Sequence, residues 1–165
     1  MALDVGDTMV GVAVSDELGV LATPRPPFRR RSQDDAERLA AMVVDWGVSA
    51  VVVGLPRNMD GSEGPQARKV REFADRLAAI VPVPLYFWDE RLSTREALGR
   101  LVSRGARAAR RRQEVDGEAA SIILEGYLRR MNQRTDALTP SGGDPAVPRD
   151  PTYPQREEGH DERQG

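Results

Sequence analysis

Residues 1–16 read MALDVGDTMVGVAVSD, and this stretch predicts two neighbouring strands with a charged residue inside the first. Apolar side chains alternate over residues 1–6 and again over 10–15, and GDTM between them has the composition of a turn. Asp4 interrupts the first strand. Because a buried carboxylate without a partner is costly, it normally shifts its pKa or acquires a cation. The pattern therefore raises the question of what Asp4 interacts with.

The following residues extend these strands into a meander and then change to a helical pattern. A third strand is predicted over 19–23, after the turn SDELG, and the proline-rich TPRPPFRRR is interpreted as a link. Ser32 and Asp35 then resemble a capping box, which predicts that a helix begins there. Gly47 is well placed to end this helix.

The rest of the chain alternates between strands and helices. SAVVVGLP (49–56) predicts a buried strand, Pro65 begins a helix that runs to about Ile80, and VPLYFWDE (83–90) predicts another strand. Two more helices are predicted, STREALGRLVSRG, which opens with a capping-box pair, and DGEAASIILEGYLRRM. This order predicts an α/β fold: a mixed five-stranded sheet, made of a three-strand meander plus two βα crossovers, flanked by helices.

Composition divides the chain into a domain over residues 1–135 and a tail over 136–165. The tail holds five of the 12 prolines and has seven acidic against three basic residues, a net charge of −4. Because the whole chain carries −2, the domain carries +2. A segment rich in proline and acid cannot bury a core, so we interpret the tail as disordered.

The chain contains no cysteine, which excludes disulfides and thiolate metal sites. No apolar stretch is long enough to span a bilayer, and no charged-then-apolar signal precedes the domain. We therefore expect a cytoplasmic protein without a membrane partner.

Three carboxylates lie where apolar segments are interrupted or end: Asp4 in the first strand, Glu90 at the end of a later one, and Asp116 at the start of the last helix. Sites in α/β sheets are usually built at the carboxyl ends of parallel strands. A set of oxygen ligands suits Mg²⁺ or Mn²⁺. Such ions, completed by phosphate oxygens and water, support hydrolysis of a phosphodiester.

Each acid also has a plainer interpretation. Asp4 is equally well read as a turn residue, and Glu90 as a strand-end acid paired with Arg91. Asp116 alone is better read as a helix N-cap. Asp89 competes with Glu90, because the local pattern does not decide which of them faces the site.

Basic residues provide candidate substrate contacts. RGARAARRRQ clusters guanidinium groups that suit a nucleic-acid backbone, although a solvated helix end explains them equally well. The polar loop GLPRNMDGSEG could close over the site, with Asn58 and Asp60 supporting it, or be an ordinary connection. The predicted substrate-binding residues are Asn58, Arg91, Arg104, Arg107, Arg110, Arg111 and Arg112.

Four segments resemble the YqgF/RuvX family of Holliday-junction-resolvase-like pre-16S rRNA nucleases: LDVGDTMVGVAVSD, VVVGLPRNMDGSEGPQARKVREFADRL, WDERLSTREA and VDGEAASIIL. The resemblance covers about residues 1–130. It implies a ribonuclease H-like fold and a catalytic and metal-binding set of Asp, Glu and Asp. By motif these fall on Asp4, Glu90 and Asp116, which favours Glu90 over Asp89.

The resemblance also implies a function, metal-dependent phosphodiester hydrolysis during maturation of the 5′ end of 16S rRNA. Its expected partners are structured nucleic acid, above all precursor 16S rRNA, and a ribosomal particle, with the protein a monomer or weak homodimer. A DNA Holliday-junction resolvase is the alternative within the same chemistry, since metal and carboxylates are indifferent to the sugar. A non-catalytic RNA-binding assembly factor is a further one. DVGDTMVG also resembles the phosphate loop of actin-like ATPases, but the chain lacks their second such loop.

Overall fold

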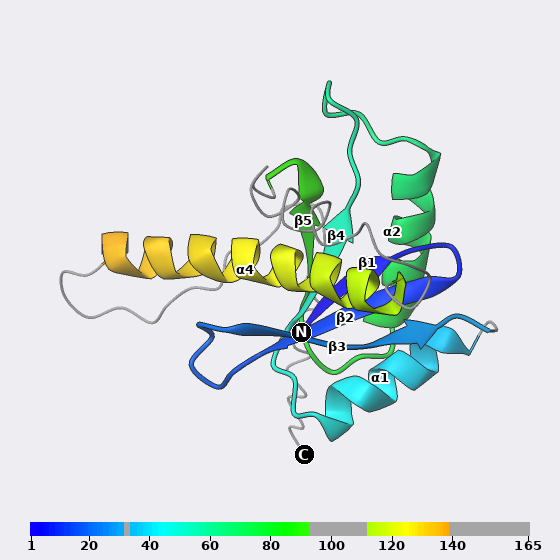
Figure 1. Ribbon diagram of the computed structural model, residues 1–165, viewed down its shortest axis with the longest axis horizontal. Helices are drawn as coiled ribbons and strands as arrows, with labels where there is room; N and C mark the ends of the chain where they lie inside the picture. Colours follow the sequence, from blue (N-terminus) through cyan, green and yellow to red (C-terminus); the bar gives the residue numbers. More distant parts are fainter. Residues whose placement is uncertain (32–33, 93–111, 139–165) are drawn as a thin grey trace, which may run out of the picture.

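The computed structural model describes residues 1–31, 34–92 and 112–138, without the side chains of 112–116 and 134–138. The described residues form one sheet with helices on both faces (Figure 1). The strands are β1 (Ala2–Val5), β2 (Met9–Ser15), β3 (Ala22–Arg29), β4 (Val51–Leu55) and β5 (Leu85–Asp89). The helices are α1 (Asp35–Asp45), α2 (Pro65–Ala78), the short 3₁₀ helix η1 (Glu90–Leu92) and α4 (Arg112–Leu138).

The sheet has the order β3-β2-β1-β4-β5. β2 pairs antiparallel with both β1 and β3, whereas β4 pairs parallel with both β1 and β5. This arrangement confirms the predicted mixed sheet of a meander plus two crossovers. The carboxyl ends of β1, β4 and β5 consequently lie at the same end of the sheet. We call this end, at which the strands terminate, the carboxyl edge, and it is distinct from the lateral edges formed by β3 and β5.

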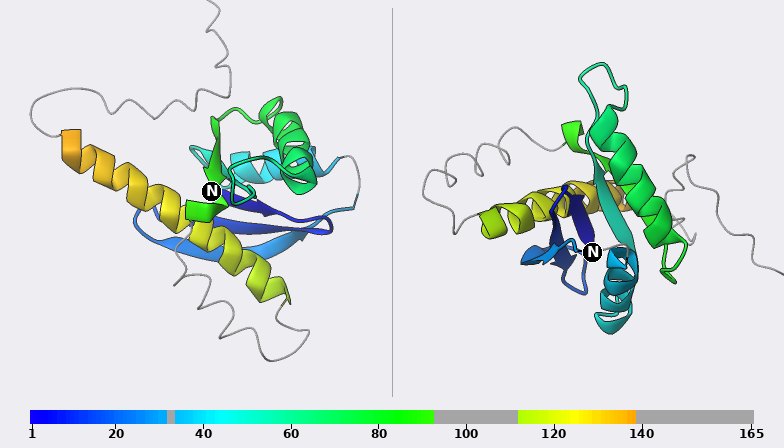
Figure 2. Two further views of the ribbon diagram at one scale, coloured as in Figure 1. Left: turned by 90° about the horizontal axis from the view of Figure 1, so that it is seen from above. Right: turned by 90° about the vertical axis from the view of Figure 1, so that its right-hand side faces the viewer.

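The sheet is covered on both faces, as Figure 2 shows. One face, the α1/α2 face, buries side chains such as Leu3 and Val53 against α1 and α2. The other, the α4 face, buries smaller side chains such as Ala2 and Val52 together with Ile123 of α4. Because successive strand residues point to opposite faces, this division also fixes where the polar residues of each strand project.

The third strand differs from the prediction. Residues 19–21 belong to the β2–β3 connection, and the supposed proline-rich link forms most of β3. Prolines lack the N–H that a central strand needs, but β3 lies at the edge of the sheet, where they are tolerated. The pairing of β2 with β3 is irregular between Val10 and Val12, opposite Pro26 and Pro27.

The first two helices agree closely with the sequence pattern. α1 begins at Asp35, whose buried carboxylate accepts the backbone N–H of Arg31 at 2.9 Å and a guanidinium N–H of Arg38 at 3.2 Å. Ser32 lies outside the described residues. Gly47 follows the helix with φ of 60°, the left-handed conformation expected of a glycine that ends a helix. α2 begins at Pro65 as predicted.

The last helix is longer than predicted. α4 begins at Arg112, so Asp116 is its fifth residue and the N-cap interpretation is wrong. The intervening arginine, glutamine and glutamate are good helix formers and extend it upstream. The helix ends at Leu138, three residues beyond the predicted domain boundary. The helix predicted over STREALGRLVSRG and the remainder of the tail lie outside the described residues.

None of the helices in the described ranges combines the length and the hydrophobicity needed to cross a membrane.

Candidate active site at the carboxyl edge

Asp4 and Glu90 approach each other at the carboxyl edge. Asp4 is the third residue of β1, pairs with Gly11 of β2 and projects toward the α4 face, since Leu3 and Val5 point the other way. It is therefore a strand residue, and the turn interpretation is wrong. Glu90 begins η1 directly after β5. Both side chains are half-buried.

The electrostatics of Glu90 reflect this proximity. Burial raises the pKa of Glu90, and the negative charges of Asp4 and Asp89 raise it further, to about 7. A carboxyl group with this pKa holds a proton near neutral pH unless a cation offsets the repulsion. Strongly perturbed carboxyl groups that face one another are typical of functional sites.

Gly54 makes room for Glu90. It lies in β4, between β1, which carries Asp4, and β5, which Glu90 follows directly. A Cβ atom at this position would lie 2.7 Å from Glu90 Oε1 and 2.5 Å from Ile123 Cδ1. Sequence reasoning missed this residue, although a glycine inside the β-branched run SAVVVGLP is a known signal of close approach.

We predict that Gly54→Ala lowers the free energy of unfolding by about 1–3 kcal/mol, because the added methyl group overpacks the contact with Ile123 and Glu90. Chemical denaturation measures the change. Gly64→Ala is a suitable control, since its added methyl group would lie at an ordinary 3.5 Å from Asn58 Oδ1. Equal stability of the two variants would contradict the close approach.

The residues on either side of Glu90 pair with each other. Arg91 Nη2 donates to Asp89 Oδ2 at 2.6 Å, and Arg91 Nε donates to both carboxylate oxygens at 3.0 and 3.1 Å. The hydrogen bonds from Arg91 hold the pKa of Asp89 below its usual value. The proposed pairing of Glu90 with Arg91 is therefore wrong. Arg91 pairs with Asp89 and offsets part of its charge, and Glu90 is left facing Asp4.

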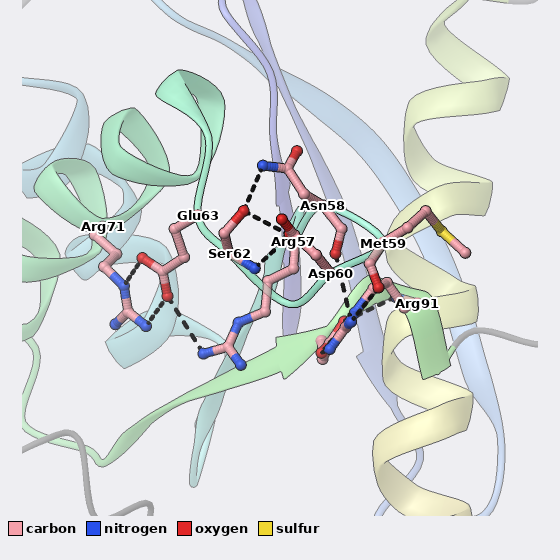
Figure 3. Close-up of polar contacts among 9 residues, drawn as sticks. Arg57, Asn58, Met59, Asp60, Ser62, Glu63, Arg71 and Arg91 are labelled. Atoms are coloured by element: carbon pink, nitrogen blue, oxygen red, sulfur yellow. Dashed lines mark hydrogen bonds and ion pairs between the residues drawn. The ribbon is translucent and has the colours of Figure 1, made fainter.

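Arg91 also holds the loop that follows β4, residues 57–64 (Figure 3). Its Nη1 atom lies within hydrogen-bond distance of the carbonyl oxygens of Asn58 (3.4 Å) and Met59 (3.3 Å). Within the loop, Asp60 accepts both the backbone N–H and the hydroxyl of Ser62. The Asn58 amide donates to the same hydroxyl at 2.9 Å. The loop is therefore an ordered turn attached to the segment that carries Glu90.

The far end of this loop is anchored on α2. Arg71 donates to the two carboxylate oxygens of Glu63 at 2.6 Å each, and Arg57 approaches the same carboxylate at 3.3 Å. The hydrogen bonds from Arg71 lower the pKa of Glu63. The Arg71 guanidinium also lies 4.6 Å from the ring centroid of Phe87 in β5. Both ends of the loop are thus fixed to the framework of the site.

We predict that Arg91→Ala loosens this loop, because both its carbonyl contacts and the Asp89 pairing are lost. Trypsin should then cleave after Arg57 about fivefold faster than in the wild-type protein, a rough figure for the loss of several local hydrogen bonds. Quantitative mass spectrometry of the peptides provides the rate. Arg68→Ala, which removes an exposed charge from α2, should leave that rate unchanged. A wild-type cleavage rate in Arg91→Ala would show that Arg91 does not hold the loop.

The structure thus brings two of the three predicted catalytic acids together. Asp116 lies in α4, the helix that covers this face, but its side chain is outside the described part. Within the described ranges, no group of three or more histidines or acids is arranged to hold a metal ion. The donor set of Asp4 and Glu90 nevertheless fits a hard divalent cation, since both are carboxylates and their mutual repulsion would be relieved by one. Of the arginine cluster, Arg112 begins α4, and Arg104, Arg107, Arg110 and Arg111 lie outside the described residues.

Comparisons with known proteins identify the family. The family model described as "RuvX: Holliday junction resolvase" matches residues 1–130. A Moorella thermoacetica protein named "Putative pre-16S rRNA nuclease" is 48% identical over 134 residues, which cover 81% of this chain and 96% of the relative. A protein of the same name from Cereibacter sphaeroides is 44% identical over 133 residues, covering 80% and 83%.

Among solved structures, that of Thermus thermophilus RuvC in complex with a Holliday junction substrate matches with a TM-score of 0.47 and 19% identity, covering 78% of this chain and 92% of that one. The family match spans most of the chain, includes both β1 and the start of α4, and agrees with the resemblance seen in the motifs. The α/β chain with its mixed five-stranded sheet belongs to the RuvX family.

Proposed function

We propose that this protein is a nuclease that hydrolyses phosphodiester bonds at the carboxyl edge of its sheet. The observation that carries the proposal is the pair formed by Asp4 and Glu90, in which burial and like charge raise the pKa of Glu90 to about 7. Such a pair is costly to maintain for structure alone, because the repulsion destabilises the fold. It is useful if a cation and a phosphate bind there.

Asp4 and Glu90, with Asp116 from α4, would hold Mg²⁺ or Mn²⁺, which supplies a water nucleophile and stabilises the leaving oxygen. The chain's own contribution is to place the two described carboxylates on either side of β4 at the carboxyl edge. Gly54 keeps the space above β4 free for the Glu90 carboxylate. The Asp89–Arg91 pair prevents a third negative charge from acting at full strength on Glu90.

The loop 57–64 would form one wall of the substrate site. Asn58 and Arg91, predicted as substrate-binding residues, belong to this wall, which is ordered by hydrogen bonds before any substrate arrives. A preformed wall lowers the entropy cost of positioning a nucleic-acid backbone. The arginines of RGARAARRRQ would add sequence-independent contacts to phosphates.

Precursor 16S rRNA is the substrate that we propose, because relatives 42–48% identical to this chain carry the name pre-16S rRNA nuclease. Processing of this RNA would place the protein in the cytoplasm and in contact with a ribosomal particle. A branched DNA junction is the second candidate, favoured by the family description as a Holliday junction resolvase. The chemistry of the acids serves either polymer, so substrate shape and the 2′-hydroxyl must provide the distinction.

A direct cleavage assay tests the proposal. Purified protein is incubated with 5′-extended 16S precursor RNA or with a four-way DNA junction, in Mg²⁺, Mn²⁺ or EDTA. We expect the RNA to be cut near the mature 5′ end only with a divalent ion. Cleavage of the junction alone would assign the protein to DNA, and binding without cleavage of either polymer would make it an assembly factor.

A further inference from the structure

The carboxyl edge also carries a basic residue at the end of β3. Arg29 is the last residue of β3 and is exposed. It pairs directly with Met9 of β2. Directly paired residues of neighbouring strands project from the same face of a sheet. Arg29 therefore projects from the same face of the sheet as Met9.

The register places Met9 and Arg29 on the α4 face. Val10 and Phe28, which also pair with each other, are both buried in the core of the α1/α2 face. Because side chains alternate along a strand, Met9 and Arg29 point to the opposite side. This is also the face from which Asp4 projects. The two acids and Arg29 thus share one face and one edge.

The separation suits nearby phosphates of one substrate strand. β3 lies two strands from β1, and the register offsets Arg29 from Asp4 by two residues along the strands. About 4.8 Å per strand and about 3.4 Å per residue therefore give roughly 12 Å between the two backbones. One nucleic-acid strand can span this gap and contact both positions through phosphates a few nucleotides apart. Gly11, the partner of Asp4 in β2, places no side chain on the intervening surface.

Neighbouring basic residues at this edge are already engaged. Arg30 donates to the Gly6 carbonyl at 2.8 Å and lies over the Phe73 ring. Lys69 forms an ion pair with Asp7 at 2.9 Å. Within the described ranges, by contrast, no hydrogen bond or ion pair holds the guanidinium of Arg29. An exposed guanidinium without an internal partner is able to bind a phosphate bidentately.

We propose that Arg29 binds a backbone phosphate of the nucleic-acid substrate a few nucleotides from the phosphodiester held at Asp4 and Glu90. This inference rests on the proposed nuclease function and adds a second anchoring point for the same strand. Arg29 fixes where the nucleic-acid strand lies on the sheet. This determines which phosphodiester bond reaches Asp4 and Glu90.

The strand itself offers a matched control. Arg25 also belongs to β3, but its guanidinium lies 6.0 Å from the Trp46 ring centroid, on the α1/α2 face. Like Arg29→Ala, Arg25→Ala therefore removes one positive charge from β3, but from the α1/α2 face and not from the α4 face. Met9→Arg combined with Arg29→Ala restores the charge on the correct face, one strand nearer to Asp4.

Binding is measured by fluorescence anisotropy in EDTA, with labelled 5′-extended 16S precursor RNA over a salt series. Arg29→Ala should bind about tenfold more weakly, and its dependence of log K on log salt should be shallower by about 0.7–0.9. Arg25→Ala should match the wild type, and Met9→Arg should recover most of the loss. With Mn²⁺ present, Arg29→Ala should raise KM and leave kcat nearly unchanged.

Wild-type affinity and salt dependence in Arg29→Ala, or an equal loss in Arg25→Ala, would overturn the inference and leave the nuclease function standing if the wild type cuts. A binding loss specific to Arg29→Ala in a protein that cuts nothing would support the Arg29 contact and overturn the nuclease function. A wild-type protein that does not bind the RNA or the DNA junction would overturn both.

Discussion

Asp4→Asn and Glu90→Gln are each expected to reduce cleavage at least a thousandfold while substrate affinity stays within about threefold of the wild type. In the proposed mechanism, carboxylates that hold a metal would contribute several kcal/mol to transition-state stabilisation, and each 1.36 kcal/mol corresponds to a factor of ten. Substrate affinity would come mainly from the proposed arginine contacts with phosphates, which these substitutions leave in place. Single-turnover cleavage and anisotropy binding measure the two quantities separately.

Asp7→Asn is the matched control for this experiment. Asp7 lies three residues after Asp4, in the β1–β2 turn, and its exposed carboxylate pairs with Lys69. Removing its charge should leave cleavage within about twofold of the wild type, since exposed ion pairs contribute little. If Asp4→Asn cuts as fast as Asp7→Asn, the acid pair is not the catalytic centre.

The second large effect concerns stability and pH. The pKa of Glu90 is about 7 in the folded protein, whereas an unperturbed glutamate has 4.5. Between these values the folded state binds more protons, so Glu90 reduces stability as the pH rises through this window. Below the window the penalty is absent, and above pH 7 it is fully present. Glu90→Gln removes the charge and therefore the penalty.

We therefore expect Glu90→Gln to melt about 5 °C above the wild type at pH 8 in EDTA, and at nearly the same temperature at pH 4.5. The expected gain in the free energy of unfolding is about 1–2 kcal/mol. This is less than the full pKa shift would imply, because the carboxyl group is partly solvated. Differential scanning calorimetry in both buffers provides the comparison. Millimolar Mn²⁺ should stabilise the wild type and have a smaller effect on the variant. A variant that melts lower than the wild type at both pH values would assign Glu90 a structural role.

Much of the fold follows from local patterns in the sequence. β4 is a run of β-branched residues, and α2 opens with a proline and places its apolar residues at helical spacing, so both were predicted. A third strand was predicted, but over 19–23, and most of β3 was interpreted as a link. Proline argues against a strand unless the strand lies at an edge, and edge position depends on the order of strands in the sheet. Pattern along a chain does not contain that order.

The candidate site was predictable in part for a similar reason. A carboxylate inside a strand is an unusual feature, so Asp4 is recognisable as a candidate from the sequence, although a turn residue explains it equally well there. Glu90 requires the family resemblance to separate it from Asp89. In the structure Asp89 pairs with Arg91 and Glu90 faces Asp4, an arrangement that favours the same choice. The role of Gly54 depends on what lies above β4 in three dimensions, and only the packing of Ile123 reveals it.

The prolines of β3 have a consequence for the behaviour of the protein at high concentration. An unpaired strand edge is a template on which a second molecule can add its own strand, and this is a common start of aggregation. Three of the eight residues of β3 are prolines and cannot donate a backbone hydrogen bond. The row of backbone N–H donors along β3 is therefore interrupted at three positions. The prolines that make β3 difficult to predict from the sequence thus also disfavour the pairing of a second molecule along this strand.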